Sequence, residues 1–288
     1  MLSSTKGNNL AANGKTNASK ALLNFGSGSY LESTGRPLYA LFFLLPLVVV
    51  YELGTILVNT DYIFHTQSRV AAFTWLMGLA EWIGMHRSLA WAFPGFVVMI
   101  ILLCWHLSSR HSWRVRIVWL LWMHVESIAL SLPLFAFGAV LNRTYVQAVT
   151  RDLAWPPILS TNGSTNYLAN IVTSIGAGIY EELVFRLILI GLIIVIMEDL
   201  LNIKDPTATI VAVLLSAALF AAHHYVGIEH GRISRLAAEP FALGSFTFRT
   251  LAGIYFAIIF RYRGYGIAAG THAAYNIILF SMKSLCAA

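Results

Sequence analysis

The chain has 288 residues, of which 58% are hydrophobic and 11% are charged, with a formal net charge of +6. A soluble domain usually carries about 25% charged residues, so this composition excludes an ordinary water-soluble protein. The positive charge does not indicate a nucleic-acid partner, because the lysines and arginines are scattered between apolar runs instead of forming one basic patch. We therefore expect an integral membrane protein whose surroundings are the lipid bilayer.

The first 35 residues are rich in Ser, Asn, Gly and Lys and predict a disordered polar tail. Apolar runs follow, and about 20 apolar residues suffice for a helix to cross a bilayer. We expect spanning helices at 37–58, 89–107, 117–141, 168–197, 207–225, 241–260 and 264–282. Segment 70–84 is shorter and contains Trp75, Glu81 and Trp82, which favours an interfacial or re-entrant helix.

The predicted fold class is an all-α, polytopic membrane helix bundle of about six to eight helices. These runs lack the strict alternation of a membrane β-barrel, which leaves helices as the spanning element. We divide the chain into the tail (1–35), N-terminal transmembrane helices (36–165) and a catalytic transmembrane core (166–285). A small excess of Lys and Arg on the side of the tail favours a cytoplasmic N-terminus. We expect the membrane to be a plasma membrane of bacterial type.

The first polar cluster, Glu181 to Arg186 (EELVFR), lies in the middle of an apolar run. An ionisable group at membrane depth costs about 3 kcal/mol or more, so it is a functional candidate. Successive helical side chains point about 100° apart, which predicts that Glu181 and Glu182 face different ways. Glu182 precedes Arg186 by four positions, the favourable order for an ion pair, and Glu181 is left to act as a base or a ligand. The alternative is a charge-compensated helix start.

The second cluster is Phe220 to His224 (FAAHH), near the end of the run 207–225. Imidazole can transfer a proton near neutral pH or bind a metal. Because neighbouring helical residues point in different directions, we expect only one of His223 and His224 to share a site with Glu181. The alternative is an interfacial pair of histidines at a helix end.

The third cluster is Thr271 to Asn276 (THAAYN), in the run 264–282. His272 and Asn276 are four positions apart and share a helix face, where an amide can brace an imidazole or a developing oxyanion. The alternative is a polar contact between helices. Three preceding glycines predict a surface on which helices approach closely, namely Gly264, Gly266 and Gly270.

Together the three clusters supply an acid, imidazoles and an amide, which can activate water against a carbonyl. The oxygen and two nitrogens of Glu181, His224 and His272 also suit a divalent metal such as Zn, so a metal cofactor stays open. No GxSxG elbow and no HExxH helix occurs in the sequence. The clusters therefore predict a hydrolase, with or without a metal.

The ordered pattern EExxxR, FxxxH and HxxxN across residues 168–282 resembles the CPBP family of intramembrane peptidases, which includes CAAX prenyl endopeptidases and bacteriocin-processing (Abi) proteins. This resemblance implies hydrolysis of a peptide bond in a membrane-associated or lipidated polypeptide, by a metallo- or a glutamate-type mechanism. It implies catalytic roles for Glu181, His224, His272 and Asn276, supported by Glu182, Arg186 and Phe220. His223 occupies a variable position of the pattern.

As a hypothesis, Glu181 and His224 activate a water molecule, and His272 with Asn276 stabilises the oxyanion. The same residues could instead form a proton relay in a proton-coupled transporter. Such a transporter predicts an internal sequence repeat, and none is apparent in this sequence. A catalytically inactive membrane scaffold is the third alternative. Five further ionisable residues in the apolar runs are interpreted as groups that bond one helix to another, namely Glu52, Glu81, His106, His124 and Glu126.

Overall fold

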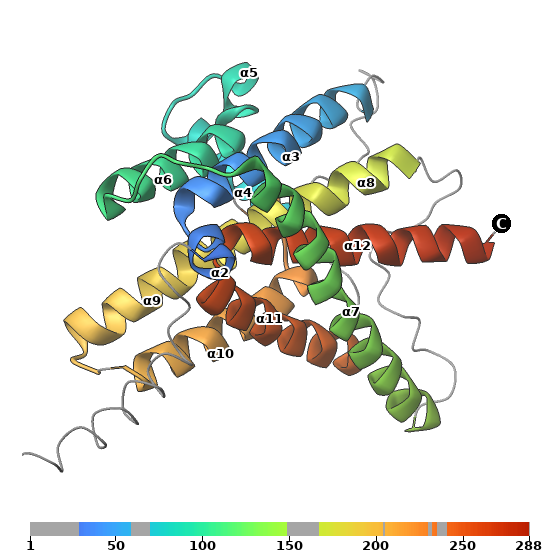
Figure 1. Ribbon diagram of the computed structural model, residues 1–288. Helices are drawn as coiled ribbons and strands as arrows, with labels where there is room; N and C mark the ends of the chain where they lie inside the picture. The colour runs from blue at the N-terminus through green and yellow to red at the C-terminus, as the bar shows by residue number, and fades with distance from the viewer. Residues whose placement is uncertain are drawn as a thin grey trace, which may run out of the picture.

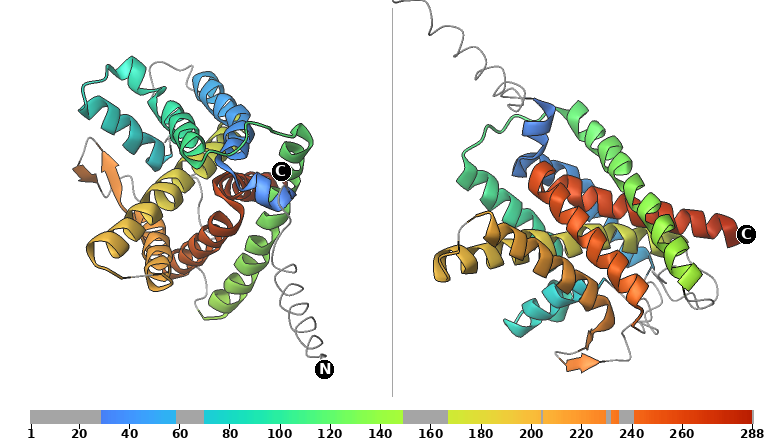
Figure 2. Two further views of the ribbon diagram at one scale, coloured as in Figure 1. Left: turned by 60° about the vertical axis from the view of Figure 1, so that its left-hand side comes forward. Right: turned by 90° about the horizontal axis from the view of Figure 1, so that it is seen from below.

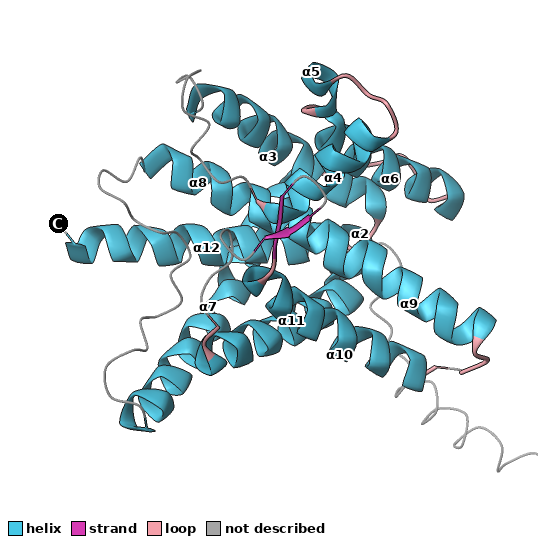
Figure 3. Cartoon of the chain, turned by 180° about the vertical axis from the view of Figure 1, so that it is seen from behind, coloured by secondary structure: helices cyan, strands magenta, loops and turns pink. Residues whose placement is uncertain are grey.

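The computed structural model describes residues 29–58, 70–148, 167–203, 205–229, 232–234 and 241–287. Over these residues the chain is a bundle of helices, which confirms the predicted all-α class (Figure 1). The only sheet in that part of the chain pairs strand β1 (Gly227–Glu229) with the antiparallel strand β2 (Arg232–Ser234). Seen from behind, this strand pair lies across the middle of the bundle (Figure 3).

Several of the long helices cross one another at wide angles (Figure 2). The long helices are α3 (Pro37–Val58), α6 (Phe93–Ser109), α7 (Ile117–Ala148), α10 (Thr207–Ala222), α11 (Leu243–Arg263) and α12 (Tyr265–Ala287). A further continuous helical segment consists of α8 (Tyr167–Gly176), η1 (Ala177–Glu181), η2 (Leu183–Ile190), α9 (Gly191–Val195) and η3 (Ile196–Leu200). Shorter helices are α2 (Tyr30–Thr34), α4 (Ala71–Trp82), α5 (Arg87–Ala90) and η4 (His223–Tyr225).

The outer surface of the bundle is apolar. Four helices are long and apolar enough to cross a membrane, at Pro37–Leu57, Ile117–Leu141, Thr207–Tyr225 and Leu243–Arg263. Large apolar side chains on these helices are exposed, among them Leu53, Leu132, Leu214 and Ile258. A surface of this kind is costly in water and is covered by lipid in a membrane, so the chain is an integral membrane protein. The type of membrane, the orientation of the chain in that membrane and the number of times it crosses stay predictions.

Helix α4 has 12 residues, too few to cross the bilayer by itself. Phe73 anchors one side of α4 and is fully buried. Its ring centroid lies 5.4 Å from that of Tyr51 of α3 and 5.1 Å from that of Tyr180 of η1. At its end Trp82 is 83% exposed. The length and this one-sided packing agree with the predicted interfacial or re-entrant helix.

Part of the predicted polar tail is ordered. Residues 1–28 lie outside the described residues, but Tyr30–Thr34 form α2, so the expectation of a tail through residue 35 was wrong at its end. The Tyr30 hydroxyl donates to Glu126 Oε2 at 2.6 Å, and Arg263 Nη2 donates to Thr34 Oγ1 at 2.9 Å. Burial and the Glu126 carboxylate raise the pKa of the Tyr30 hydroxyl, which therefore stays a donor. These partners lie far along the chain, where local composition gives no sign of them.

The predicted close approach at the start of α12 is confirmed. A Cβ on Gly266 would lie 3.0 Å from Ala40 Cα of α3, and one on Gly270 would lie 2.5 Å from Ser127 Oγ of α7. Gly264 ends α11 with φ +84°, a conformation that favours glycine. These glycines let α12 enter the centre of the bundle, where Figure 1 shows it crossing behind α7.

Segment η1 packs directly on the backbone of α12. A Cβ on Gly178 would lie 2.5 Å from the carbonyl oxygen of Ala269 and 2.7 Å from the nitrogen of Ala273, so only hydrogen fits there. The Tyr265 hydroxyl donates to the Ile179 carbonyl at 2.8 Å and fastens the same two elements. This contact places Glu181, the last residue of η1, and Glu182 beside the histidine of α12.

Candidate active site

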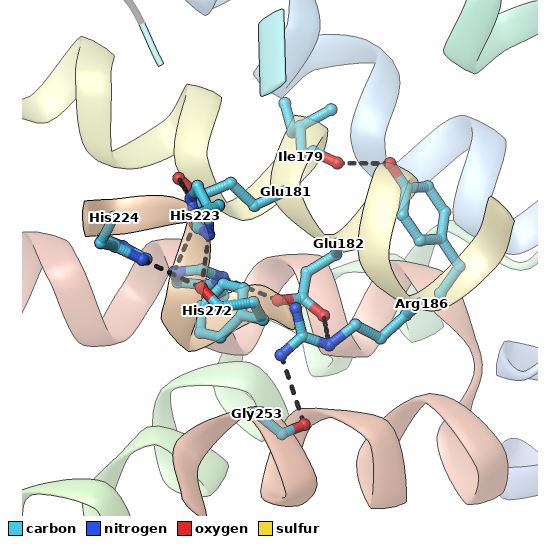
Figure 4. A network of polar contacts seen from close by, with 10 residues as sticks. Ile179, Glu181, Glu182, Arg186, His223, His224, Gly253 and His272 are labelled. Carbon is cyan, nitrogen blue, oxygen red and sulfur yellow. Dashed lines mark hydrogen bonds and ion pairs between the residues drawn. The ribbon is translucent and has the colours of Figure 1, made fainter. Parts of the chain in front are cut away.

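Glu181 and Glu182 lie where the central helical segment departs from α geometry. Glu181 ends the π-helical turn η1, and η2, also π-helical, begins directly after Glu182. Such turns bond i to i+5 and are frequent at functional sites. The wider turn decreases the angle between successive side chains, and both carboxylates reach the ring of His272 (Figure 4). The expectation that the two glutamates face separate surroundings, which assumed α geometry, was therefore wrong in part.

Glu182 and Arg186 form the predicted ion pair. Arg186 Nε lies 3.1 Å from Glu182 Oε2, and both side chains have 0% exposure. Arg186 Nη2 also donates to the Gly253 carbonyl of α11 at 3.3 Å, and its guanidinium stands 4.2 Å from the ring centroid of Phe220. The pair lies inside the bundle, so the alternative of a charge-compensated helix start does not hold.

His272 connects the two glutamates. Its Nδ1 lies 2.8 Å from Glu182 Oε1, and its Nε2 lies 3.8 Å from Glu181 Oε2. An ionised carboxylate can only accept, so Nδ1 carries a proton and donates it to Glu182. The ring of Phe256 stacks on the imidazole at 4.6 Å and 15°. His272 is therefore held by a charge on one side and an aromatic ring on its face.

His223 and His224 both belong to the site, and the expectation that only one of them would was wrong. The α-helix ends at Ala222, and the two histidines begin the 3₁₀ turn η4. Nδ1 of His224 lies 3.0 Å from the Phe220 carbonyl, which Nδ1 of His223 also contacts, and the ring centroids are 3.9 Å apart. Both rings thus fold back onto the preceding turn, and His223 Nε2 lies 3.7 Å from Glu181 Oε1.

Three side chains of the site could hold a metal ion. One ligand atom each from Glu181, His223 and His224 lies within 4.8 Å of the other two. This set differs from the predicted set of Glu181, His224 and His272, because His223 takes the place of His272. One carboxylate oxygen and two imidazole nitrogens suit zinc by donor type.

The two remaining predicted residues lie at the edge of this cluster. Phe220 lies under it, with its ring 5.9 Å from that of His272 and 5.5 Å from that of Phe185. Asn276 lies one helical turn beyond His272 on α12 and is 8% exposed. Its amide makes no hydrogen bond to the described residues, so it is available to a bound molecule.

Sequence reasoning missed two aromatic contacts of the site. Trp75 of α4 meets the ring of His223 edge-on at 5.9 Å, and Phe256 of α11 stacks on His272. No periodicity pointed to either residue, because their partners lie on other helices. The doubled histidine at 223 and 224 was visible, but it was interpreted with α-helical angles.

Comparison with known proteins gives one match, which covers the part of the chain that carries most of the site. Residues 163–278 match the family model described as type II CAAX prenyl endopeptidase Rce1-like. Over this segment the chain is similar to CAAX prenyl endopeptidases. Neither the search of curated proteins nor the search of solved structures found a match.

Every site residue lies within the matched segment except Trp75 of α4, which contributes from outside it. This similarity, together with the apolar helices, indicates a membrane peptidase. The interhelical interpretation of two other glutamates agrees with the structure, since the Tyr180 hydroxyl donates to Glu52 Oε1 at 3.0 Å and Arg263 Nε donates to Glu126 Oε1 at 2.5 Å. His124 instead bonds the Leu120 carbonyl of its own helix at 2.9 Å.

Proposed function

We propose that this CAAX-type peptidase hydrolyses a peptide bond of a membrane-associated or lipidated polypeptide within the bilayer. The observation that carries the proposal is the Glu181 carboxylate, which is 9% exposed and lies 3.7 and 3.8 Å from Nε2 of His223 and His272. A carboxylate kept among imidazoles in an apolar bundle is costly, and general acid–base chemistry accounts for its presence.

We assign the activation of water to Glu181, assisted by His224. Glu181 accepts a proton from water as the water oxygen attacks the scissile carbonyl carbon. The same proton then passes to the leaving amine nitrogen as the carbon–nitrogen bond breaks, so protons balance over the cycle. Nδ1 of His224 faces the Phe220 carbonyl at 3.0 Å, which leaves Nε2 to hold the water.

His272 and Asn276 are the proposed oxyanion donors. Nδ1 of His272 donates to Glu182 at 2.8 Å, so Nε2 is the atom that can face the substrate. In the doubly protonated ring, Nε2–H can donate to the developing oxyanion while Nδ1–H donates to Glu182. The Asn276 amide, one turn further along α12, supplies a second, neutral donor.

A divalent metal also fits the site by donor type. Glu181, His223 and His224 would hold it, and it would supply Lewis-acid polarisation of a carbonyl or of water. The mechanism proposed here assigns proton transfer to the carboxylate itself. Glu181 therefore cannot act as the free base and as a metal ligand at the same time.

The test is cleavage of a peptide that ends in a prenylated cysteine followed by two aliphatic residues and one further residue. Full-length protein in detergent or liposomes is compared with Glu181→Gln and with Glu198→Gln, an exposed glutamate at the far end of the same helical segment. We expect Glu181→Gln to lower kcat by about 10²- to 10⁴-fold and Glu198→Gln to leave it unchanged. Undiminished kcat in folded Glu181→Gln would contradict the proposal.

The oxyanion assignment is tested in the same assay. Asn276→Ala should lower kcat by about 10²- to 10³-fold with little change in KM, because the amide acts in the transition state. Asn170→Ala on α8 is the matched control, since Asn170 and Asn276 are both 8% exposed. Equal effects of the two substitutions would remove Asn276 from the mechanism.

The substrate is sought in cells if the prenylated peptide resists cleavage. Membrane proteomes of cells with the wild-type chain and with Glu181→Gln should differ in uncleaved precursors, which accumulate in the variant. A precursor without a prenyl group would keep the peptidase assignment and replace the substrate class. Identical proteomes would contradict both.

A further inference from the structure

The mechanism above leaves out His223, although its Nε2 lies 3.7 Å from Glu181 Oε1 and its side chain is only 6% exposed. The ring is enclosed by Trp75, Phe185 and Phe220, with centroids 5.9, 4.8 and 5.4 Å away. Aromatic walls on several sides restrict the rotamers of an imidazole. His223 therefore presents Nε2 to Glu181 as a fixed feature of the site.

His223 and His224 are arranged as a pair of nitrogen ligands. Nδ1 of each ring contacts the Phe220 carbonyl. Histidines that bind metals usually donate their other ring N–H to a backbone carbonyl or a carboxylate, which fixes the tautomer. With Nδ1–H given to Phe220, each ring keeps a lone pair on Nε2. The pair is thus prepared for a cation before one binds.

The spacing of the three donor atoms is close to that of a zinc site. One oxygen of Glu181 and one nitrogen each of His223 and His224 lie within 4.8 Å of one another. Zinc binds such atoms at about 2.0–2.2 Å, which sets tetrahedral ligands about 3.4 Å apart. The side chains would have to draw in by about 1.4 Å at most, a movement that side-chain torsions allow. A fourth position would stay open for water.

We propose that Glu181, His223 and His224 form a zinc-binding site that inhibits the peptidase. This inference rests on the proposed function, because zinc would occupy the carboxylate that serves as the base. Peptidases of the HExxH type keep a further glutamate beside the zinc ligands to act as base. Here the neighbouring Glu182 cannot replace it, since it has 0% exposure and its oxygens contact Arg186 and His272 at 3.1 and 2.8 Å. Bound zinc removes the base and leaves no substitute.

Metal binding is tested without any peptidase assay. The full-length chain in detergent is stripped with chelator and titrated with cobalt chloride, whose visible absorption reports tetrahedral coordination, and zinc chloride then displaces the cobalt. We expect one cobalt per chain in the wild type and in His111→Ala, an exposed histidine between α6 and α7. In His223→Ala and in His224→Ala the affinity should fall by roughly tenfold or more, since even an outer partner of a ligand is worth that much.

The variant His272→Ala separates the two possible ligand sets. It should keep the cobalt spectrum, whereas a site built on His272 would lose it. Size-exclusion profiles show whether each variant is folded, and either His223→Ala or His224→Ala suffices for the decision. Wild-type cobalt affinity in a folded His223→Ala chain, or no stoichiometric cobalt in the wild type, overturns the proposal.

For the wild type and for each variant, inhibition is measured as the zinc chloride concentration that halves cleavage of the prenylated peptide, relative to the same protein without zinc. His223→Ala should raise this concentration by roughly tenfold or more. Activation of the stripped wild type by zinc overturns the inhibitory role and makes zinc a cofactor. Cobalt binding without any cleavage supports the metal site and overturns the inhibitory role together with the proposed function, so the two failures are distinguishable.

Discussion

Glu181 and Glu182 are neighbours in the sequence, yet the two sides of the site that they define are built differently. On the Glu182 side, short contacts of 3.1 Å to Arg186 and 2.8 Å to His272 enclose a carboxylate with 0% exposure. On the Glu181 side, the imidazole nitrogens of His223 and His272 stand 3.7 and 3.8 Å away, and 9% of the side chain is exposed. One carboxylate is held by short contacts, and the other makes only longer contacts to imidazole nitrogens and is slightly exposed.

The difference indicates separate tasks for the two carboxylates. A buried charge with close partners orients its neighbours, and Glu182 fixes His272 through Nδ1. A base must reach the proton that it takes, so it needs free space beside its oxygens. The contacts of Glu182 should therefore govern stability, whereas Glu181 should govern turnover.

The largest effect on stability should follow removal of the cation from the Glu182 side. Arg186→Met leaves the Glu182 carboxylate buried without its cation, which we expect to lower the free energy of unfolding in detergent by about 3–5 kcal/mol. The double variant Glu182→Gln with Arg186→Met should recover most of this loss. The Gln oxygen still accepts from His272 Nδ1, and no charge is left unpaired.

Denaturant unfolding of the two variants and the wild type measures this effect. If Arg186→Met alone were as stable as the wild type, the ion pair would not hold the Glu182 side together. If the double variant were no better than the single one, the loss would come from the packing of Arg186 on Phe220 instead of from charge.

Sequence patterns found the Glu182 side more completely than the Glu181 side. The ion pair of Glu182 and Arg186 follows from a spacing of four within one helix, which holds whatever surrounds it. The contact of Glu182 with His272 joins residues 90 positions apart, and the sequence analysis did not predict it. Local rules therefore sufficed only where a partner lay on the same helix.

The Glu181 side depended on departures from regular helix geometry, which the pattern could not show. His223 was assigned to another face because α-helical angles were assumed, and the 3₁₀ turn η4 brings it back toward Glu181. The enclosing ring of Trp75 comes from α4, outside the segment that matches the family. Such contacts are set by tertiary packing, and no spacing along the chain encodes them.

A smaller loss of stability should follow a change in the distance between η1, which ends at Glu181, and α12, which carries His272. A Cβ in Gly178→Ala would lie 2.5 Å from the Ala269 carbonyl oxygen, so η1 must move away from α12. We expect a loss of about 1–3 kcal/mol in unfolding free energy. Turnover should also fall, because the same movement lengthens the 2.8 Å contact between Glu182 and His272.

Gly191→Ala is the matched control on the same helical segment, because a Cβ there would meet nothing within 4 Å. Alanine favours the helix over glycine by about 0.5–1 kcal/mol, so this variant should be slightly more stable with unchanged turnover. The two variants are compared by unfolding in detergent and by cleavage of the prenylated peptide. A Gly178→Ala chain with wild-type stability and turnover would mean that the close approach does not set the site.

The smallest effects should come from two further Arg–Glu contacts, which lie outside the site. Arg263 donates to both oxygens of Glu126 at 2.5 and 2.8 Å, but these side chains are 13% and 19% exposed. Water therefore screens this pair more than the pair at Glu182, and we expect Arg263→Gln to cost about 1–2 kcal/mol in unfolding free energy. Turnover should not change, since neither residue contacts the glutamates of the site. Arg36→Gln, which breaks a 2.7 Å surface pair with Glu32, should cost less than about 0.5 kcal/mol. If Arg263→Gln and Arg186→Met lost the same unfolding free energy in this assay, burial would not distinguish the Glu182 side from the rest of the bundle.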